Sequence, residues 1–242
     1  MHPDIAAPKR EYNLLTGKNN DDILKDILGF SNEEINKLKN PWKNTIFYSE
    51  KVLNHYIKKT NKKKICLKLP YYIIYLDNIY CFFPNLKFIN IIRDGRDVAC
   101  SLRTHPKWKI VDGKVLPTEH KNSFKWCVRR WVSCINNGFK WKNSKNFYNL
   151  KYENLINDTK KEMDKLFEFL NLDAISEKNL LSFYKYEKNE DHFQNIEVGK
   201  SIYKKSIGRW KKDLNKNEIE IFKKMAGNLL IKLDYEKSNN WK

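Results

Sequence analysis

The residues best suited to bind an anion lie in one strand–turn–helix segment, residues 84–102. Its apolar run 88–92 predicts a buried strand, because β-branched and aromatic side chains suit a pleated surface. The strand ends at the polar turn 93–97, and a helix is expected to follow. Backbone N–H groups at a helix N-terminus bind phosphate, and an arginine such as Arg93 adds a planar fork of donors. The segment therefore predicts a phosphate site, with a solvated charged turn as the alternative.

Composition indicates a globular protein with anionic partners. The chain has 242 residues, of which 41% are hydrophobic and 14% aromatic, so we expect one domain over residues 1–242. The formal net charge of +18 suggests nucleotides, nucleic acid or acidic polymers as partners. However, the charge is spread along a chain that uses Lys, Asn and Ile heavily throughout. We therefore give it little weight and expect no nucleic acid partner.

Cysteine usage and hydropathy exclude other classes. The five cysteines contain no Cys-x-x-Cys pair, so we expect reduced core residues and neither a disulfide nor a metal site. No apolar run reaches the roughly 20 residues that a membrane helix needs. The chain as given is expected to be cytoplasmic, and an anchor or signal before Met1 would change that.

Alternating strands and helices predict an α/β fold. Strands are expected at 65–68, 88–92 and 147–152, and the first two flank a helix at 72–83. Such a βαβ unit predicts that these two strands form a parallel pair. Three capping boxes are expected to open further helices, at Ser31 with Glu34, Thr159 with Glu162, and Asn215 with Glu218.

Two polar segments are candidates for an acceptor pocket. Residues 105–122 predict a long irregular loop, which inside a compact domain is usually functional or mobile. Residues 184–203 have no clear periodicity, and we expect the two segments to shape the pocket together.

Four segments resemble the sulfotransferase family, whose members transfer a sulfuryl group from 3′-phosphoadenosine-5′-phosphosulfate (PAPS). Residues 83–102 resemble the family's 3′-phosphate motif, and Asn-Leu-Lys-Tyr-Glu-Asn-Leu at 149–155 is similar to its Leu-Arg-Tyr-Glu-Asp-Leu segment. Residues 207–214 resemble its C-terminal Gly-Arg-Trp motif, and residues 2–8 resemble the stretch after its first helix. The four segments follow the family's order over almost the whole chain.

The resemblance implies a three-layer fold with a central parallel sheet flanked by helices, related to that of P-loop NTPases. It implies PAPS as donor co-substrate, no metal, and a small-molecule or glycan acceptor that offers a hydroxyl or an amine. By position, Arg93 and Ser101 match the residues that bind the 3′-phosphate, and Tyr152 matches a tyrosine that contacts adenine. A tyrosine in the core at a strand end is the alternative for Tyr152. The residues Lys204, Lys205 and Arg209 would supply the charge of a basic loop near the same phosphate, although Lys205 replaces a family glycine.

On the acceptor side, the resemblance implies two catalytic residues. Glu11 stands where some relatives carry a glutamate, which would act as general base on an acceptor hydroxyl; a solvated glutamate is the alternative. Lys68 matches a family lysine and would stabilise charge on the transferred group. Leu69 replaces the threonine that follows this lysine, and no histidine stands where cytosolic members carry their base. A histidine-based mechanism from that site is therefore excluded.

The family's 5′-phosphosulfate loop and the strand before it would precede His2, and the sequence as given does not contain them. We therefore expect a sulfotransferase fold without its first strand and phosphate loop, poor stability and impaired activity. A degenerate nucleotide-binding relative without catalysis is the alternative function. A basic nucleic-acid-binding protein ranks third, and the absence of a Gly-Lys-Ser/Thr loop disfavours kinase-like phosphoryl transfer.

Overall fold

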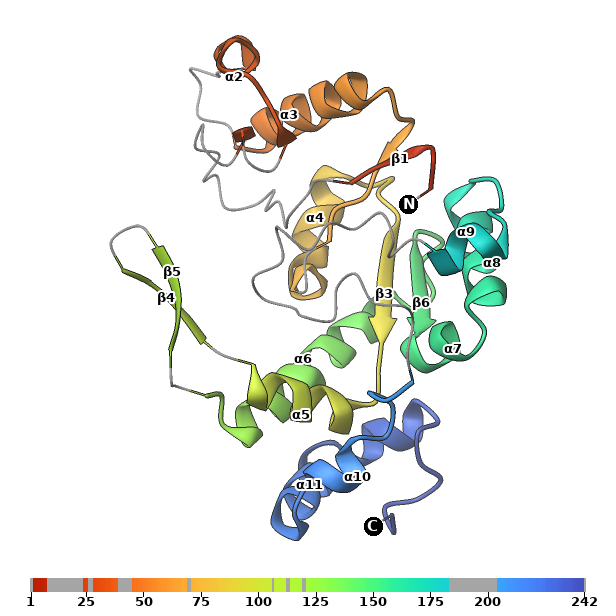
Figure 1. The fold of residues 1–242 in the computed structure, drawn as a ribbon. Helices are drawn as coiled ribbons and strands as arrows, with labels where there is room; N and C mark the ends of the chain where they lie inside the picture. Colours follow the sequence, from red (N-terminus) through yellow and green to blue (C-terminus); the bar gives the residue numbers. More distant parts are fainter. Residues whose placement is uncertain are drawn as a thin grey trace. The chain divides into compact units, whose positions relative to one another are not determined.

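The computed structural model describes residues 2–7, 24–25, 28–38, 45–68, 71–105, 107–111, 114–118, 121–182 and 204–241. The chain divides into two compact units, Met1–Pro84 with Asn171–Ser201 and Asn85–Leu170 with Ile202–Lys242. Each unit combines helices with a pair of parallel strands, which confirms the predicted α/β fold (Figure 1). That residues 1–242 form a single domain stays a prediction.

The first unit is built around a short parallel pair, in which β1 (Ile5–Ala6) bonds to β2 (Lys64–Ile65). Its helices are α2 (Asn32–Leu38), α3 (Thr45–Thr60), the 3₁₀ turn η1 (Tyr72–Tyr75), α4 (Leu76–Phe82) and α9 (Glu177–Ser182). The buried apolar core consists of Ala6, Leu24, Leu28, Phe30, Ile35, Val52 and Tyr56.

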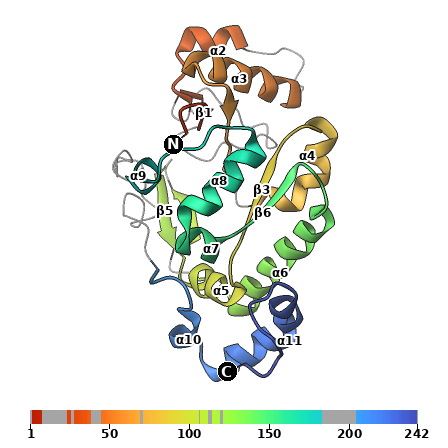
Figure 2. The same cartoon turned by 90° about the vertical axis from the view of Figure 1, so that its right-hand side faces the viewer.

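The second unit contains β3 (Phe88–Ile92), which pairs in parallel with β6 (Phe147–Lys151). Its helices are α5 (Gly95–Thr104), α6 (Phe124–Trp141), α7 (Tyr152–Asn157), α8 (Thr159–Leu170), α10 (Trp210–Asp213) and α11 (Lys216–Lys232). Both views show β3 and β6 side by side, and α5 follows β3 after a short turn (Figures 1 and 2). The strands start with Phe88 stacked on Phe147, whose ring centroids are 5.6 Å apart.

The predicted pairing of the first two strands of the βαβ unit is wrong. The strand at 64–65 bonds to β1, whereas β3 bonds to β6, its five-residue match in length. A helical crossover fixes the direction of two strands, but consecutive strands are hydrogen-bonded neighbours in only about two-thirds of cases. The connecting helix is also split, because Tyr72–Tyr75 is a 3₁₀ turn.

The loop expected at 105–122 contains regular structure. The strands β4 (Lys107–Val111) and β5 (Lys114–Thr118) form an antiparallel hairpin in which Lys107 pairs with Thr118. Its sequence, with Trp108, Val111 and Val115, suits a strand. The charged residues between them obscure the alternation of apolar and polar side chains that indicates a strand. The other candidate segment for the acceptor pocket, residues 184–203, lies outside the described residues.

Two of the three predicted capping boxes are confirmed. Asn215 opens α11 with both reciprocal bonds to Glu218, and Ser31 opens α2 in the same way with Glu34. The third is wrong: α8 is capped by Asp158, whose carboxylate accepts a hydrogen bond from the Lys161 N–H.

Cysteine burial differs from the prediction at two positions. All five thiols are free, and Cys100 and Cys127 are buried as expected, but Cys66 and Cys81 are exposed. Among the described residues, no helix combines the length and apolar character needed to span a membrane.

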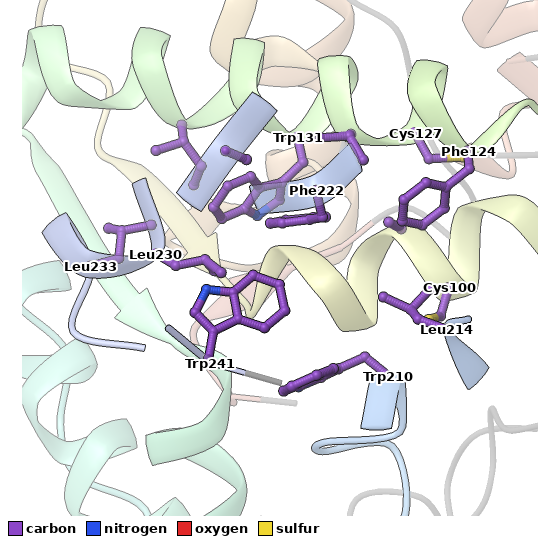
Figure 3. Close-up of a cluster of buried hydrophobic side chains, with 14 of the residues drawn as sticks. Cys100, Phe124, Cys127, Trp131, Trp210, Leu214, Phe222, Leu230, Leu233 and Trp241 are labelled. Carbon is purple, nitrogen blue, oxygen red and sulfur yellow. The ribbon is translucent and has the colours of Figure 1, made fainter. Parts of the chain in front are cut away.

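The core of the second unit gathers large aromatic side chains between α5, α6, α10 and α11 (Figure 3). Trp131 lies at its centre, 5% exposed, with its ring centroid 5.8 Å from that of Phe222. The indole Nε1 donates to the Arg93 carbonyl at 3.1 Å, which fixes the ring against the start of α5. A Cβ at Gly95 would stand only 2.5 Å from Trp131 Cδ2. The first residue of α5 must therefore be glycine.

We predict that Gly95→Ala destabilises the protein by about 1–3 kcal/mol, because the buried indole has no room to move. Thermal or urea unfolding measures the loss. Gly227→Ala is the matched control, since the three atoms nearest its Cβ all belong to the side chain of the exposed Asn239, which can rotate away. Equal stability of Gly95→Ala and wild type would contradict this packing.

A charged cluster in the first unit joins α2 to α3. The Glu34 carboxylate accepts hydrogen bonds from Lys59 Nζ at 2.8 Å, Ser31 N at 2.7 Å and His55 Nε2 at 3.0 Å. These partners, Lys59 first, lower the pKa of Glu34 from 4.5 to about 2. A carboxyl with a depressed pKa stabilises the fold above its unfolded pKa, and this contribution is lost as the pH falls through the folded value.

We predict that wild type is more stable than Glu34→Gln near neutral pH, and that the difference shrinks as the pH falls from about 4.5 to about 2. Urea unfolding at several pH values measures both. Glu33→Gln, on the same helix and paired with the exposed Lys37, should show a smaller difference at neutral pH. A pH-independent effect of Glu34→Gln would refute the ionic explanation.

Candidate functional site

The candidate site forms where β3 and β6 end. Ile92 is in register with Lys151, so the next residues, Arg93 and Tyr152, leave the same edge of the sheet together. The Arg93 Cζ lies 4.7 Å from the centroid of the Tyr152 ring. Ligands of open α/β sheets bind at this carboxyl edge. Parallel pairing therefore unites two predicted residues that are far apart in the sequence.

The start of α5 completes one side of this edge. Asp94 is the N-cap, and its carboxylate accepts from the Arg96 N–H at 2.9 Å. The Asp94 N–H in turn donates to Glu153 Oε1 at 2.9 Å, while Glu153 Oε2 accepts from the Tyr235 hydroxyl at 2.8 Å. Burial, together with the neighbouring Glu153 carboxylate, raises the pKa of Tyr235. Glu153 thus connects the two strand ends through hydrogen bonds.

The turn 204–209 closes the site from the other side and contributes Ser206, which the sequence analysis missed. The Ser206 carbonyl accepts a hydrogen bond from Arg93 Nη2, and its hydroxyl lies 3.0 Å from the Tyr152 hydroxyl. Ser206 thereby contacts both residues that follow the strands. Its place between the predicted Lys205 and the Gly-Arg-Trp motif was the available signal.

Asp97 fixes this turn from the first turn of α5. Its carboxylate is completely buried and accepts from the Gly208 N–H at 2.7 Å and the Trp210 N–H at 3.0 Å. Burial raises the pKa of Asp97, and the two N–H donors act against that increase. Gly208 has a φ of +73°, a left-handed conformation that favours glycine.

Arg93 keeps part of its donor capacity. Its side chain is 20% exposed and its Nη2 is 4.0 Å from Asp97 Oδ2, the outer limit of an ion pair. Its buried Nε has no hydrogen-bond partner in the described part of the chain. The guanidinium is therefore held in place by one carbonyl and one aromatic ring while donors remain for an anion.

Ser101 lies one helical turn beyond Asp97, on the same face of α5. It is half-buried, and its carbonyl accepts from Thr104 Oγ1 at 3.0 Å and from His105 N at 3.1 Å. No hydrogen bond joins its hydroxyl to another described residue. The structure therefore places Ser101 on the face that carries Asp97, and no hydrogen bond between the described residues joins it to Arg93.

Arg96 has a structural role, which the alternative of a solvated turn did not anticipate. It is 2% exposed and forms ion pairs with Asp94, at 2.7 Å, and with Glu236. Its Cζ lies 3.9 Å from the centroid of the Trp210 ring and 4.6 Å from that of the Trp241 ring. With all these partners, Arg96 ties the C-terminal segment to α5. Trp210 itself packs in the core and is 4% exposed.

The predicted basic residues of the turn differ in their surroundings. Lys204 and Lys205 are exposed. Arg209 forms an ion pair with Asp213 on its own short helix, with Nη2 at 2.6 Å and Nε at 2.7 Å from Oδ2. Its charge is therefore already partly compensated.

The two predicted catalytic residues are Lys68 and Glu11. Lys68 is exposed and belongs to the first unit, and Glu11 lies outside the described residues. Their roles stay predictions. Among the described residues, no group of three or more His, Cys, Asp or Glu side chains is placed to hold a metal ion.

Comparison with known proteins agrees with the fold. The model of the sulfotransferase family matches residues 8–177. No curated protein matches. Solved structures at low sequence identity share the fold. The sulfotransferase domain of the olefin synthase from Synechococcus PCC 7002 is 16% identical with a TM-score of 0.66, over 93% of this chain and 86% of that one.

Two further structures are similar over a smaller share of their length. A sulfotransferase from Mycobacterium avium is 14% identical with a TM-score of 0.51, over 79% of this chain and 47% of that one. The sulfotransferase domain of the curacin biosynthetic pathway is 17% identical with a TM-score of 0.50, over 75% and 67%. The family match covers more than half of the chain, and the fold is the one expected of such a protein. The chain therefore belongs to the sulfotransferase family.

Proposed function

We propose that this sulfotransferase takes its sulfuryl group from PAPS and passes it to a hydroxyl or amine of a small-molecule or glycan acceptor. The observation that carries the proposal is the Arg93 guanidinium, held at the end of β3 by the Ser206 carbonyl and the Tyr152 ring with donors left over. A 3′-phosphate is a dianion whose oxygens match such a donor set.

The proposed roles rest on the resemblance to the family, joined for the described residues by their surroundings. Arg93 binds the 3′-phosphate, Ser101 offers its hydroxyl from α5, and the exposed Lys204 and Lys205 add positive charge. Tyr152 presents its ring to the adenine. In the transfer, the acceptor oxygen or nitrogen attacks sulfur as the bond from sulfur to the phosphate oxygen breaks. The acceptor loses its proton, for which Glu11 is the proposed base, and Lys68 stabilises charge on the transferred group.

A nucleotide-binding relative without catalysis remains the alternative function. Family membership does not favour it, and no described residue of the site is incompatible with nucleotide binding. Both functions need the 3′-phosphate site, so binding of 3′,5′-bisphosphoadenosine, the nucleotide product, tests that site independently of turnover.

We predict that Arg93→Ala weakens binding of 3′,5′-bisphosphoadenosine by about tenfold to a hundredfold, because it removes charge-assisted hydrogen bonds. Binding of 5′-AMP, which has no 3′-phosphate, should change little. Isothermal titration calorimetry measures both. Arg129→Ala removes the same charge from an exposed position on α6 and should leave both affinities unchanged. Equal losses of the two nucleotides in Arg93→Ala would exclude the assignment.

We predict that Tyr152→Ala weakens binding of both nucleotides, because an adenine contact does not depend on the 3′-phosphate. Tyr152→Phe keeps the ring and should retain most of the affinity, although it loses the bond to Ser206. The same titrations measure this. Wild-type affinity of Tyr152→Ala for 5′-AMP would instead make Tyr152 a support for Arg93 alone.

A further inference from the structure

Asp97 is an unexpected neighbour for a phosphate site. It is a carboxylate with no exposed surface, 4.0 Å from the Arg93 guanidinium to which we assign the 3′-phosphate. A negative charge at this place repels a phosphate dianion and partly neutralises the arginine. Direct electrostatics would therefore make Asp97 a disadvantage for nucleotide binding, and its benefit must come from something else.

The carboxylate has two better partners than Arg93. It accepts the Gly208 N–H at 2.7 Å and the Trp210 N–H at 3.0 Å, both charge-assisted bonds across more than a hundred residues of sequence. Trp210 is the first residue of α10, whose N-cap Arg209 provides no side-chain cap. Asp97 therefore caps a helix to which it does not belong, and it holds the left-handed Gly208 just before that helix.

This capped turn carries the contacts that hold the candidate site together. Ser206 lies two residues before Gly208, its carbonyl accepts from Arg93, and its hydroxyl bonds to Tyr152. A shift of the turn would thus release Arg93 and Tyr152 at the same time. The connection runs from Asp97 through Gly208 and Ser206 to the guanidinium.

We propose that Asp97 is a positioning residue for the 3′-phosphate: its carboxylate fixes the turn 204–209 so that Ser206 holds Arg93 in its binding position. This role rests on the proposed function, because it assumes that Arg93 binds the 3′-phosphate. It predicts that loss of the Asp97 carboxylate changes the affinity for the 3′-phosphate in the direction opposite to that expected from charge alone. Removal of a negative charge would strengthen phosphate binding, whereas release of the turn weakens it.

The test is Asp97→Asn, which keeps the shape of the side chain and removes its charge. Titration with 3′,5′-bisphosphoadenosine should show affinity reduced about tenfold or more, with 5′-AMP affected much less. Hydrogen exchange should become faster in peptides that cover residues 204–213. Glu162→Gln is the matched control, since Glu162 is also a buried carboxylate of this unit, 8% exposed and paired with Lys165, and it should change neither readout.

Unchanged or tighter binding of 3′,5′-bisphosphoadenosine by Asp97→Asn would overturn the role of Asp97 and leave the proposed function intact. No preference of the wild-type chain for 3′,5′-bisphosphoadenosine over 5′-AMP would overturn the proposed function itself. If Asp97→Asn does not fold, Gly208→Ala tests the same turn without a change of charge. A Cβ there meets nothing within 4 Å, so only the backbone at φ +73° is strained. The same selective loss of affinity is expected, and wild-type affinity would overturn the role of Asp97.

Discussion

The buried carboxylate of Asp97 is the interaction on which the candidate site depends. It binds two backbone N–H groups of a segment more than a hundred residues away, and through that segment it reaches Ser206 and Arg93. Burying a carboxylate is costly unless hydrogen bonds compensate it, and here both partners come from one turn. These two hydrogen bonds thus fix the turn 204–209 relative to the start of α5.

A second buried charge, that of Arg96, stabilises the start of α5. Arg96 lies against the rings of Trp210 and Trp241 and binds the carboxylates of Asp94 and Glu236. The two arginines of this turn, Arg93 and Arg96, therefore have different roles. Arg93 keeps hydrogen-bond donors for a ligand, whereas the guanidinium of Arg96 is buried and paired with two carboxylates. Cation–π contacts and paired carboxylates are what make a buried guanidinium tolerable.

Much of the fold followed from local patterns. The apolar run 88–92 and the capping boxes at Ser31 and Asn215 each depend on neighbours within a few residues, and each prediction is confirmed. The hairpin at 107–118 and the pairing of β2 with β1 did not follow. Strand pairing joins distant segments, so it depends on competition among partners that no local window contains.

For the site, the sequence by itself determined which residues could bind phosphate, because an arginine at a strand end before a helix start is a local feature. The resemblance added Tyr152 and the basic turn. Only the tertiary structure decided that Arg96 is buried, that Arg209 is engaged with Asp213, and that Ser206 and Asp97 complete the arrangement. The physical reason is that exposure and hydrogen-bond partners are set by contacts between distant segments, which residue type and spacing do not specify.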